Sequence, residues 1–224
     1  MTSSAQGATP EPPLARVYAA IFAAVGWAVL ALQFVLVMRL APDNNLTRPQ
    51  AAVNFFSYFT VIINLVVAVA FTCRLLPPNS RAYRTATDPR IATAIATYIT
   101  IVGAVYSLLL RAVWNPTGLH LVADVALHDV LPVVYVLFWV IFVRHDATSP
   151  WSDAARWLTV PLAYVACALV RGAATGWYPY YFLDVGALGP GSVARVIVAL
   201  AVAFWVVGLG FVALTRWLGR RRRS

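Results

Sequence analysis

The sequence predicts an all-α integral membrane protein, a bundle of six transmembrane helices with both ends in the cytoplasm. Of its 224 residues, 61% are hydrophobic and 11% are charged, whereas soluble domains average about 25% charged residues. Six apolar runs are each long enough, at about 20 residues, to cross a bilayer as a helix. Every basic residue is an arginine, and the arginines lie at the ends of the apolar runs, where they determine topology.

The six expected helices are separated by segments that break helices. After the successive runs these segments read APDNN, LPPNS, WNPTG, SPW and GWYPYYFLDVGALGPG, all rich in turn residues. The first 13 residues are polar and proline-rich, a composition typical of disorder. We therefore expect a disordered N-terminus over residues 1–13, a transmembrane domain over 14–218 and a basic tail over 219–224. The spans are expected at residues 17–38, 55–76, 91–111, 122–143, 157–175 and 192–217.

The distribution of arginine predicts the orientation. Twelve arginines flank the runs on the side of the two termini and five lie on the other side, so the positive-inside rule places both ends in the cytoplasm of a multi-pass inner (plasma) membrane protein. The net charge of +9 comes without a basic helix face or an aromatic stacking module, which argues against nucleic acid as a partner. The terminal RWLGRRRR is expected to bind anionic lipid. Exclusive use of arginine is associated with GC-rich bacterial genomes.

The fourth run carries ionisable residues, which are costly in a membrane and usually functional. Asp124 lies one helical turn before His128, where it is placed to accept the ring proton. Pro132 lacks an N–H, so it leaves the His128 carbonyl without its helical donor and weakens or kinks the helix. Asp129 points about 100° away from His128. These residues predict the centre of a buried polar site.

The second run places polar residues at the same depth. Thr60 and His128 both lie roughly 8 to 9 Å below the outer ends of their helices. Phe56, Thr60 and Asn64 are four residues apart and are expected to share one face. A hydroxyl and an imidazole at one depth indicate nucleophilic catalysis, with Thr60 as nucleophile and His128 as base. Asp124 or Asp129 then orients His128, and the oxyanion charge falls to Asn64 or Arg111.

More ordinary roles remain open for several of these residues. Threonine in a membrane helix commonly bonds the carbonyl four residues earlier or a neighbouring helix, and Ser57 competes with Thr60 as nucleophile. Asp129 is an alternative partner for Arg111 or Arg171 in a structural ion pair. The aromatic loop that contains Tyr178 and Tyr181 suits a membrane interface, or forms a lid over the site. Candidate substrate-binding residues are Phe56, Trp114, Tyr178 and Tyr181.

Three segments, FFSYFTVIIN, LHDVLPVVYVLFWVIF and YPYYFLD, resemble the androgen-induced and androgen-dependent family of transmembrane threonine hydrolases, and most of all its bacterial six-span relatives. The resemblance implies hydrolysis of fatty acid esters of hydroxy fatty acids by a threonine nucleophile and an intramembrane histidine, which correspond to Thr60 and His128. It also implies a membrane lipid or lipid-like substrate. No cofactor or metal is expected, because Cys73 and Cys167 form no ligand spacing.

Two other functions fit the same residues. The first is non-enzymatic binding of a lipid or small molecule, or proton-coupled transport, in which Asp124, His128, Asp129 and Arg111 form the ligand or proton path. The apolar inner half and the absence of a visible inverted repeat argue against transport. The second is a purely structural membrane scaffold, for which His128→Leu is expected only to stabilise the protein.

Overall fold

The computed structural model describes residues 11–145 and 148–221, so the predictions for residues 1–10 and for the last three residues of the basic tail lie outside it. Within the described residues, all regular structure is helical. The long segments are α1 (Pro13–Leu40), α2 (Arg48–Phe56), α3 (Phe59–Cys73), α5 (Pro89–Val105), α6 (Gly118–Val125), α7 (Leu131–Phe142), α9 (Thr159–Thr175) and α11 (Pro190–Arg221). The short segments are η1 (Pro42–Asn44), α4 (Arg81–Thr87), η2 (Tyr106–Leu110), η3 (Ala126–Val130), α8 (Ser152–Arg156), η4 (Tyr181–Leu183) and α10 (Val185–Leu188).

Five helical segments of the described chain are long and apolar enough to cross a membrane, and α2 with α3 adds a sixth only if the bent pair counts as one span. The continuous second helix predicted over residues 55–76 is therefore wrong in detail. The helix ends at Phe56, restarts at Phe59 and bends by 72° at the break. At the break, the Ser57 hydroxyl donates to the Val53 carbonyl at 2.6 Å, and Tyr58 is extended. Such a local bond competes with continuation of the helix.

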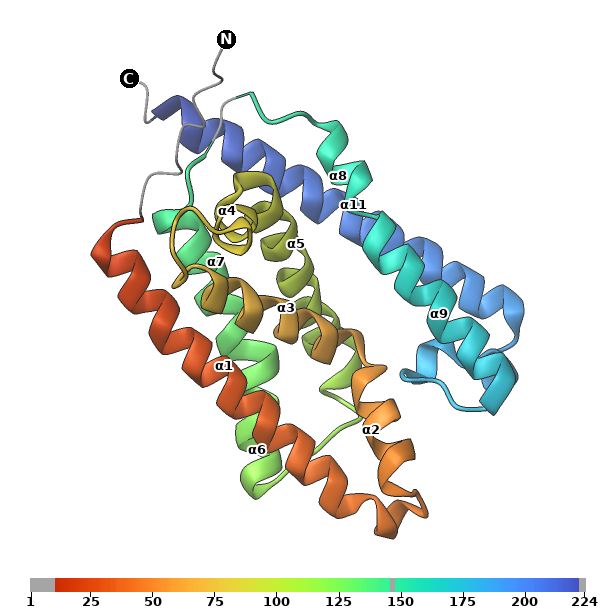
Figure 1. The fold of residues 1–224 in the computed structure, drawn as a ribbon. Coiled ribbons are helices and arrows are strands. Elements are labelled where there is room, and N and C mark those ends of the chain that lie inside the picture. The colour runs from red at the N-terminus through yellow and green to blue at the C-terminus, as the bar shows by residue number, and fades with distance from the viewer. Residues whose placement is uncertain (1–10, 146–147, 222–224) are drawn as a thin grey trace.

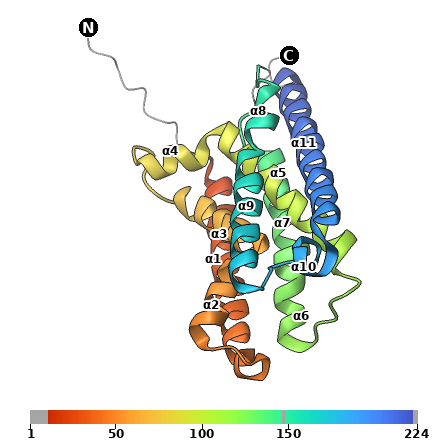
Figure 2. The same cartoon turned by 90° about the vertical axis from the view of Figure 1, so that its right-hand side faces the viewer.

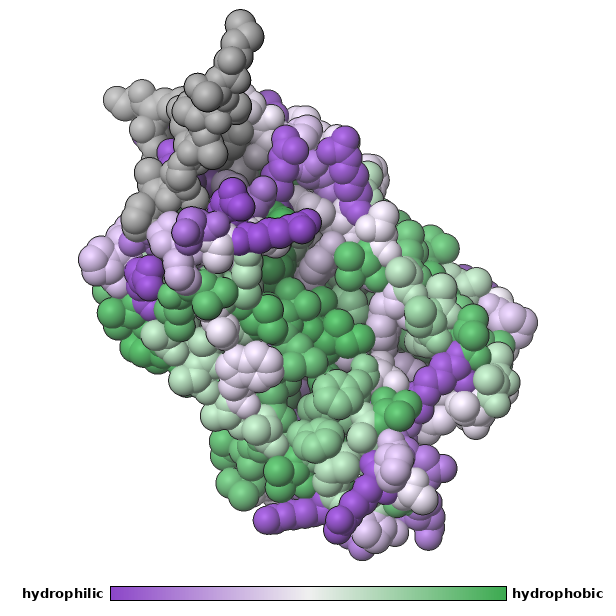
Figure 3. All heavy atoms as spheres, viewed as in Figure 1, coloured by the Kyte–Doolittle hydropathy of each residue, from purple (hydrophilic) through white to green (hydrophobic). Residues whose placement is uncertain are grey.

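The outer surface has the distribution of polarity that a membrane demands. Figure 3 shows a broad apolar band across the middle of the molecule, with hydrophilic residues gathered toward both ends. Large side chains stand exposed within the long helices, among them Val170, Val198 and Val206. In water such a surface is unfavourable, whereas lipid solvates it. These features are compatible with a multi-pass membrane protein.

The core lies among α1, α3, α5 and α7, and α8, α9 and α11 pack beside it (Figures 1 and 2). Phe71, Tyr135, Phe138 and Trp139 are fully buried at its centre. The start of α1 and the end of α11 lie at one end of the bundle, whereas α2 and α6 lie at the other (Figure 1). The end that carries α2 and α6 holds the candidate site.

A buried arginine ties the N-terminal segment to the bundle. Arg74 is 1% exposed, forms an ion pair with Glu11 and lies 4.7 Å from the centre of the Phe138 ring. The Glu11 N–H donates to the Tyr83 hydroxyl at 2.9 Å. Disorder was expected through residue 13, but the described chain is already anchored at Glu11.

Candidate functional site

Two π-helical turns face each other near one end of the bundle. In the fourth run the turn is η3, where the Leu131 N–H bonds the carbonyl of Ala126, five residues earlier. This turn lies next to Pro132, which has no backbone N–H to donate. The sequence predicted a weakened or kinked helix here, and the structure accommodates the proline with the wider turn. In the third run η2 is closed by the Arg111 N–H, which bonds the Tyr106 carbonyl at 2.8 Å. Such turns occur frequently at functional sites.

The two turns bring Tyr106 onto His128. The rings are stacked with their centres 3.9 Å apart and their planes 16° from parallel. The Tyr106 hydroxyl donates to Asp124 Oδ2. His128 Nδ1 lies 2.9 Å from the Asp124 carbonyl oxygen and 3.3 Å from Asp124 Oδ1. Two acceptors at Nδ1 favour the tautomer that is protonated there, which leaves Nε2 with a free lone pair.

Thr60 lies in the first turn of α3, directly after the break in the second run. The first N–H groups of a helix have no partner within the helix. The Thr60 N–H donates to the Tyr180 hydroxyl at 3.3 Å, and Thr60 Oγ1 lies 3.4 Å from the same hydroxyl. The partner of the Thr60 hydroxyl is therefore Tyr180, and not the carbonyl four residues earlier that the ordinary role of a membrane threonine would give it.

Two side chains of α9 satisfy the polar groups of the break. Tyr164 donates its hydroxyl to the Ser57 carbonyl at 2.9 Å. Arg171 donates to the Ser57 hydroxyl, also at 2.9 Å, and to the Asn54 side-chain oxygen. Buried backbone groups outside regular helix require such partners. The contacts occupy Ser57, the competing nucleophile.

The larger cavity has a volume of about 640 Å³ and is lined by both Thr60 and His128. Asp124 and Tyr106 also line it. The hydroxyl and the imidazole predicted from the sequence therefore meet one shared space rather than separate faces of the protein. The other polar or aromatic residues that line it are Gln33, Asn44, Asn54, Phe55, Tyr58, Trp114, Trp177, Tyr180 and Tyr181.

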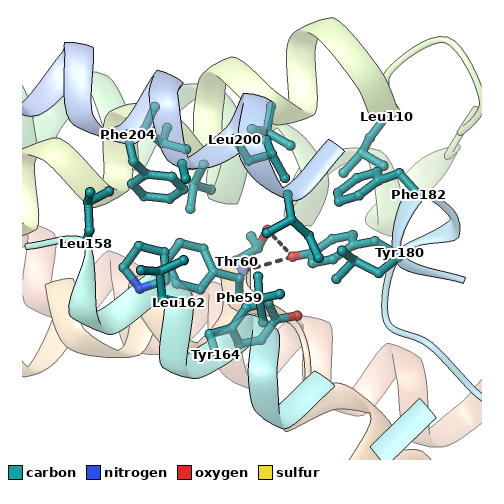
Figure 4. Close-up of a pocket in the computed structure, with 18 residues that line it drawn as sticks. Phe59, Thr60, Leu110, Leu158, Leu162, Tyr164, Tyr180, Phe182, Leu200 and Phe204 are labelled. Atoms are coloured by element: carbon teal, nitrogen blue, oxygen red, sulfur yellow. Dashed lines mark hydrogen bonds between the residues drawn. The ribbon is translucent and has the colours of Figure 1, made fainter. Parts of the chain in front are cut away.

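A second, smaller cavity of about 60 Å³ lies on the other side of Thr60. Apolar side chains of α3, α5, α9 and α11 surround it (Figure 4). Thr60, Tyr180 and Leu110 line both cavities. Thr60 and Tyr180 thus lie at the boundary between a chamber whose lining includes several polar residues and an almost wholly apolar one.

Of the other residues that the sequence predicts for the site, some line the larger cavity and some do not. Asp124, Trp114 and Tyr181 line the larger cavity. Asn64 does not line either cavity, because its fully buried amide donates to the carbonyls of Thr60 at 2.9 Å and Leu127 at 3.2 Å. It fastens α3 to the π turn, so the predicted oxyanion role does not fit its position.

Arg111 and Asp129 form an ion pair with each other, as the structural alternative predicted. The side chains are 51% and 39% exposed, and neither residue lines the larger cavity. Arg111 also lies 5.1 Å from the centre of the Tyr106 ring. This position does not fit the predicted roles, in which Asp129 orients His128 and Arg111 receives the oxyanion charge.

Two predicted substrate contacts are displaced. Phe56 does not share a face with Thr60, because the break separates the two residues, and it is half-exposed outside the cavity lining, where Phe55 stands instead. Tyr178 packs against Gly172, whose missing Cβ leaves space for the ring. Neither residue lines the larger cavity.

The sequence does not predict the roles of Tyr106, Tyr180, Tyr164 and Arg171 in the site. Tyr180 belongs to the aromatic loop that the sequence predicts at the membrane interface or as a lid over the site. The available signal was the polar break after Phe56, whose free backbone groups require partners. Among the described residues, no group of three or more His, Cys, Asp or Glu side chains is placed to hold a metal ion.

Comparisons of the chain with protein-family models, with curated proteins and with solved structures find no match.

Proposed function

We propose that the protein is an intramembrane hydrolase of lipid esters, above all fatty acid esters, with Thr60 as nucleophile and His128 as base. The observation that carries the proposal is the cavity that both side chains line. The segments around Thr60 and His128 also resemble the transmembrane threonine hydrolases named above. An ester that enters this cavity is within reach of a hydroxyl and an imidazole held by separate helices.

The chemistry follows from these positions. Thr60 Oγ1 attacks the ester carbonyl carbon while its proton passes to His128 Nε2, and Asp124 stabilises the resulting imidazolium. The tetrahedral intermediate collapses, the carbon–oxygen bond to the alcohol breaks, and the alcohol leaves with the proton from His128. Water, deprotonated by His128, then attacks the acyl-threonine; as the bond between the acyl carbon and Thr60 Oγ1 breaks, His128 returns the proton to Oγ1 and the fatty acid leaves. Atoms and charge balance over the cycle.

No hydrogen bond joins the Thr60 hydroxyl to the His128 ring within the described part of the chain. Without substrate, catalytic hydrogen bonds are often long or misaligned and tighten in the complex. The Thr60 hydroxyl instead interacts with Tyr180, so substrate entry has to release it toward the cavity and His128.

The proposed topology has six crossings, with α2 and α3 forming one broken span and both ends in the cytoplasm. The start of α1 and the end of α11 lie at one end of the bundle (Figure 1), as an even number of crossings requires. The arginine distribution assigns this end to the cytoplasm. The larger cavity then lies in the outer half of the membrane, where lipid esters are available as substrates. The proposed location is the inner (plasma) membrane of a bacterium.

The test is hydrolysis of a fluorogenic long-chain acyl ester by the purified protein in detergent micelles. We expect Thr60→Ala and His128→Ala each to abolish turnover, because either change removes one of the two reacting groups. The matched controls are Thr100→Ala, which removes a hydroxyl bonded to its own helix at 2.7 Å, and His120→Ala. Both controls should keep wild-type turnover. Full activity in a folded Thr60→Ala protein would end the hydrolase proposal.

Non-enzymatic binding of a lipid or small molecule is the second candidate, because a cavity of about 640 Å³ lies in the size range of ligand sites. It predicts that ligand binding survives Thr60→Ala and that no ester is cleaved. Proton-coupled transport was expected to use Arg111 and Asp129 as part of the proton path. These two residues instead pair with each other and do not line the cavity, so the geometry supports transport less well.

A further inference from the structure

The Tyr180 side chain is fixed between the two cavities. It follows α9 in the chain and precedes η4, and its ring is stacked on Phe182 with centres 5.0 Å apart and planes 4° from parallel. The Tyr58 ring meets it edge-on at 5.6 Å. Tyr180 is 9% exposed and lines both cavities. These contacts leave the ring little freedom, so its hydroxyl has a defined position.

That hydroxyl lies against the group proposed as the nucleophile (Figure 4). Its oxygen accepts the Thr60 N–H at 3.3 Å and lies 3.4 Å from Thr60 Oγ1. Accepting the N–H does not use the phenolic proton, so the Tyr180 hydroxyl can still donate, to Thr60 Oγ1 or to a group bound beside it. The two donors, a backbone N–H and a phenolic O–H, thus converge beside the Thr60 hydroxyl.

We propose that Tyr180 is a catalytic residue, whose phenolic O–H binds the carbonyl oxygen that becomes negatively charged when Thr60 attacks an ester. The inference rests on the proposed hydrolase function and adds a residue to its site. Asn64 and Arg111 were the sequence candidates for this role, and neither lines the cavity. Tyr180 does, and it contacts Thr60 directly.

The distances fit this role. In the tetrahedral intermediate, the oxyanion is bonded to the carbon that Thr60 Oγ1 has attacked, so it lies close to Oγ1. A donor 3.4 Å from Oγ1 is therefore near enough to reach the oxyanion at an ordinary hydrogen-bond length of about 2.7 Å. The Thr60 N–H stands in the first turn of α3, where the helix dipole also favours negative charge.

The step itself needs no additional reagent. As the bond between Oγ1 and the carbonyl carbon forms, the electron pair of the carbonyl double bond moves onto oxygen. The Tyr180 hydroxyl donates a hydrogen bond to this oxygen without transferring a proton, while the Thr60 N–H stays bonded to the Tyr180 oxygen and holds that hydroxyl in place. When the intermediate collapses, the pair returns and the alcohol leaves. Donors fixed in advance in a site with few water molecules are the usual source of such stabilisation.

The direct test is Tyr180→Phe, which removes the hydroxyl and retains a ring that stacks on Phe182. With the fluorogenic long-chain acyl ester we expect kcat to fall about 100-fold or more, the loss typical of one oxyanion donor. We expect KM to stay within about twofold, because the hydrogen bond is strongest in the transition state. The control is Tyr98→Phe, which removes a buried hydroxyl that donates to the Trp157 carbonyl at 2.9 Å and should leave both constants unchanged.

A second variant covers the case in which Tyr180→Phe does not fold. Incorporation of 3-fluorotyrosine at position 180 keeps the shape of the ring and makes its hydroxyl a stronger donor. Measured at a pH where the phenol stays protonated, kcat should rise while KM stays constant, a response that a merely structural tyrosine does not give. A wild-type kcat in Tyr180→Phe, or a kcat that does not respond to fluorine, overturns the inference about Tyr180. The proposed hydrolase function still stands in that case if Thr60→Ala is inactive. Full activity in Thr60→Ala overturns the hydrolase itself.

Discussion

At the scale of single residues, the best-defined part of the site is the contact of His128 with Asp124. The sequence predicted that these residues meet because they are four apart on a helix, and the structure places Asp124 Oδ1 3.3 Å from His128 Nδ1. The sequence did not predict the Tyr106 ring stacked on His128. That contact depends on how two helices meet, which local spacing does not encode.

We expect Asp124→Asn to lower kcat by about 10²- to 10⁴-fold, the range that general acid–base groups contribute. The amide removes the negative charge that stabilises the imidazolium, and its NH₂ group favours the wrong tautomer of His128. Steady-state hydrolysis of the acyl ester measures this loss. The matched variant is Asp129→Asn, whose partner is the half-exposed Arg111. It should retain kcat and lose no more than about 1 kcal/mol of stability; equal losses of kcat in both variants contradict the assigned roles.

At the scale of elements, the site depends on interruptions of regular helices. Hydropathy predicted the second run as one helix, because all its residues are compatible with a span. Its break after Phe56 is held by Tyr164, Arg171 and Tyr180, which lie more than 100 residues later in the chain. The partners of the break come from tertiary packing, so neither periodicity nor composition indicates them.

The π turn that carries His128 packs closely on α5 at Gly103. A Cβ at this position meets the His128 carbonyl oxygen at 3.0 Å and the Pro132 Cβ at 3.5 Å. We expect Gly103→Val to push the turn away, to lower stability by about 1–3 kcal/mol through overpacking, and to reduce kcat by displacing His128. Denaturation in detergent and ester hydrolysis measure the two effects.

The control for Gly103→Val is Gly210→Val in α11, where a Cβ meets nothing within 4 Å. This variant should retain both stability and kcat. If the two valine variants behave alike, close packing of α5 on the π turn does not position His128.

At the scale of the whole molecule, composition and hydropathy were sufficient to predict an all-helical chain with spans of membrane length. The balance of apolar and charged residues decides this property, and it is distributed over the whole chain. The contact of Arg74 with Glu11 was not predicted, because an arginine at the end of an apolar run reads as a topology signal. Its burial becomes apparent only when the N-terminal segment, α4 and α7 are placed around it.

The arrangement of the whole bundle also places one residue between two chambers. Thr60 borders the larger cavity with its polar residues and the small apolar one. The sequence predicts Thr60 and His128 at one depth, but it predicts neither cavity, since cavities depend on how side chains from several helices pack. The shared cavity is what makes the hydroxyl and the imidazole a candidate catalytic pair.

The most direct test of this pairing is to locate the residue that a fluorophosphonate hydrolase probe modifies, by mass spectrometry of the labelled and digested protein. The account predicts one adduct on Thr60 in the wild type, and loss of this adduct in a folded His128→Ala protein, because Thr60 then has no base. An adduct on another residue, or labelling of Thr60 that does not depend on His128, would contradict it.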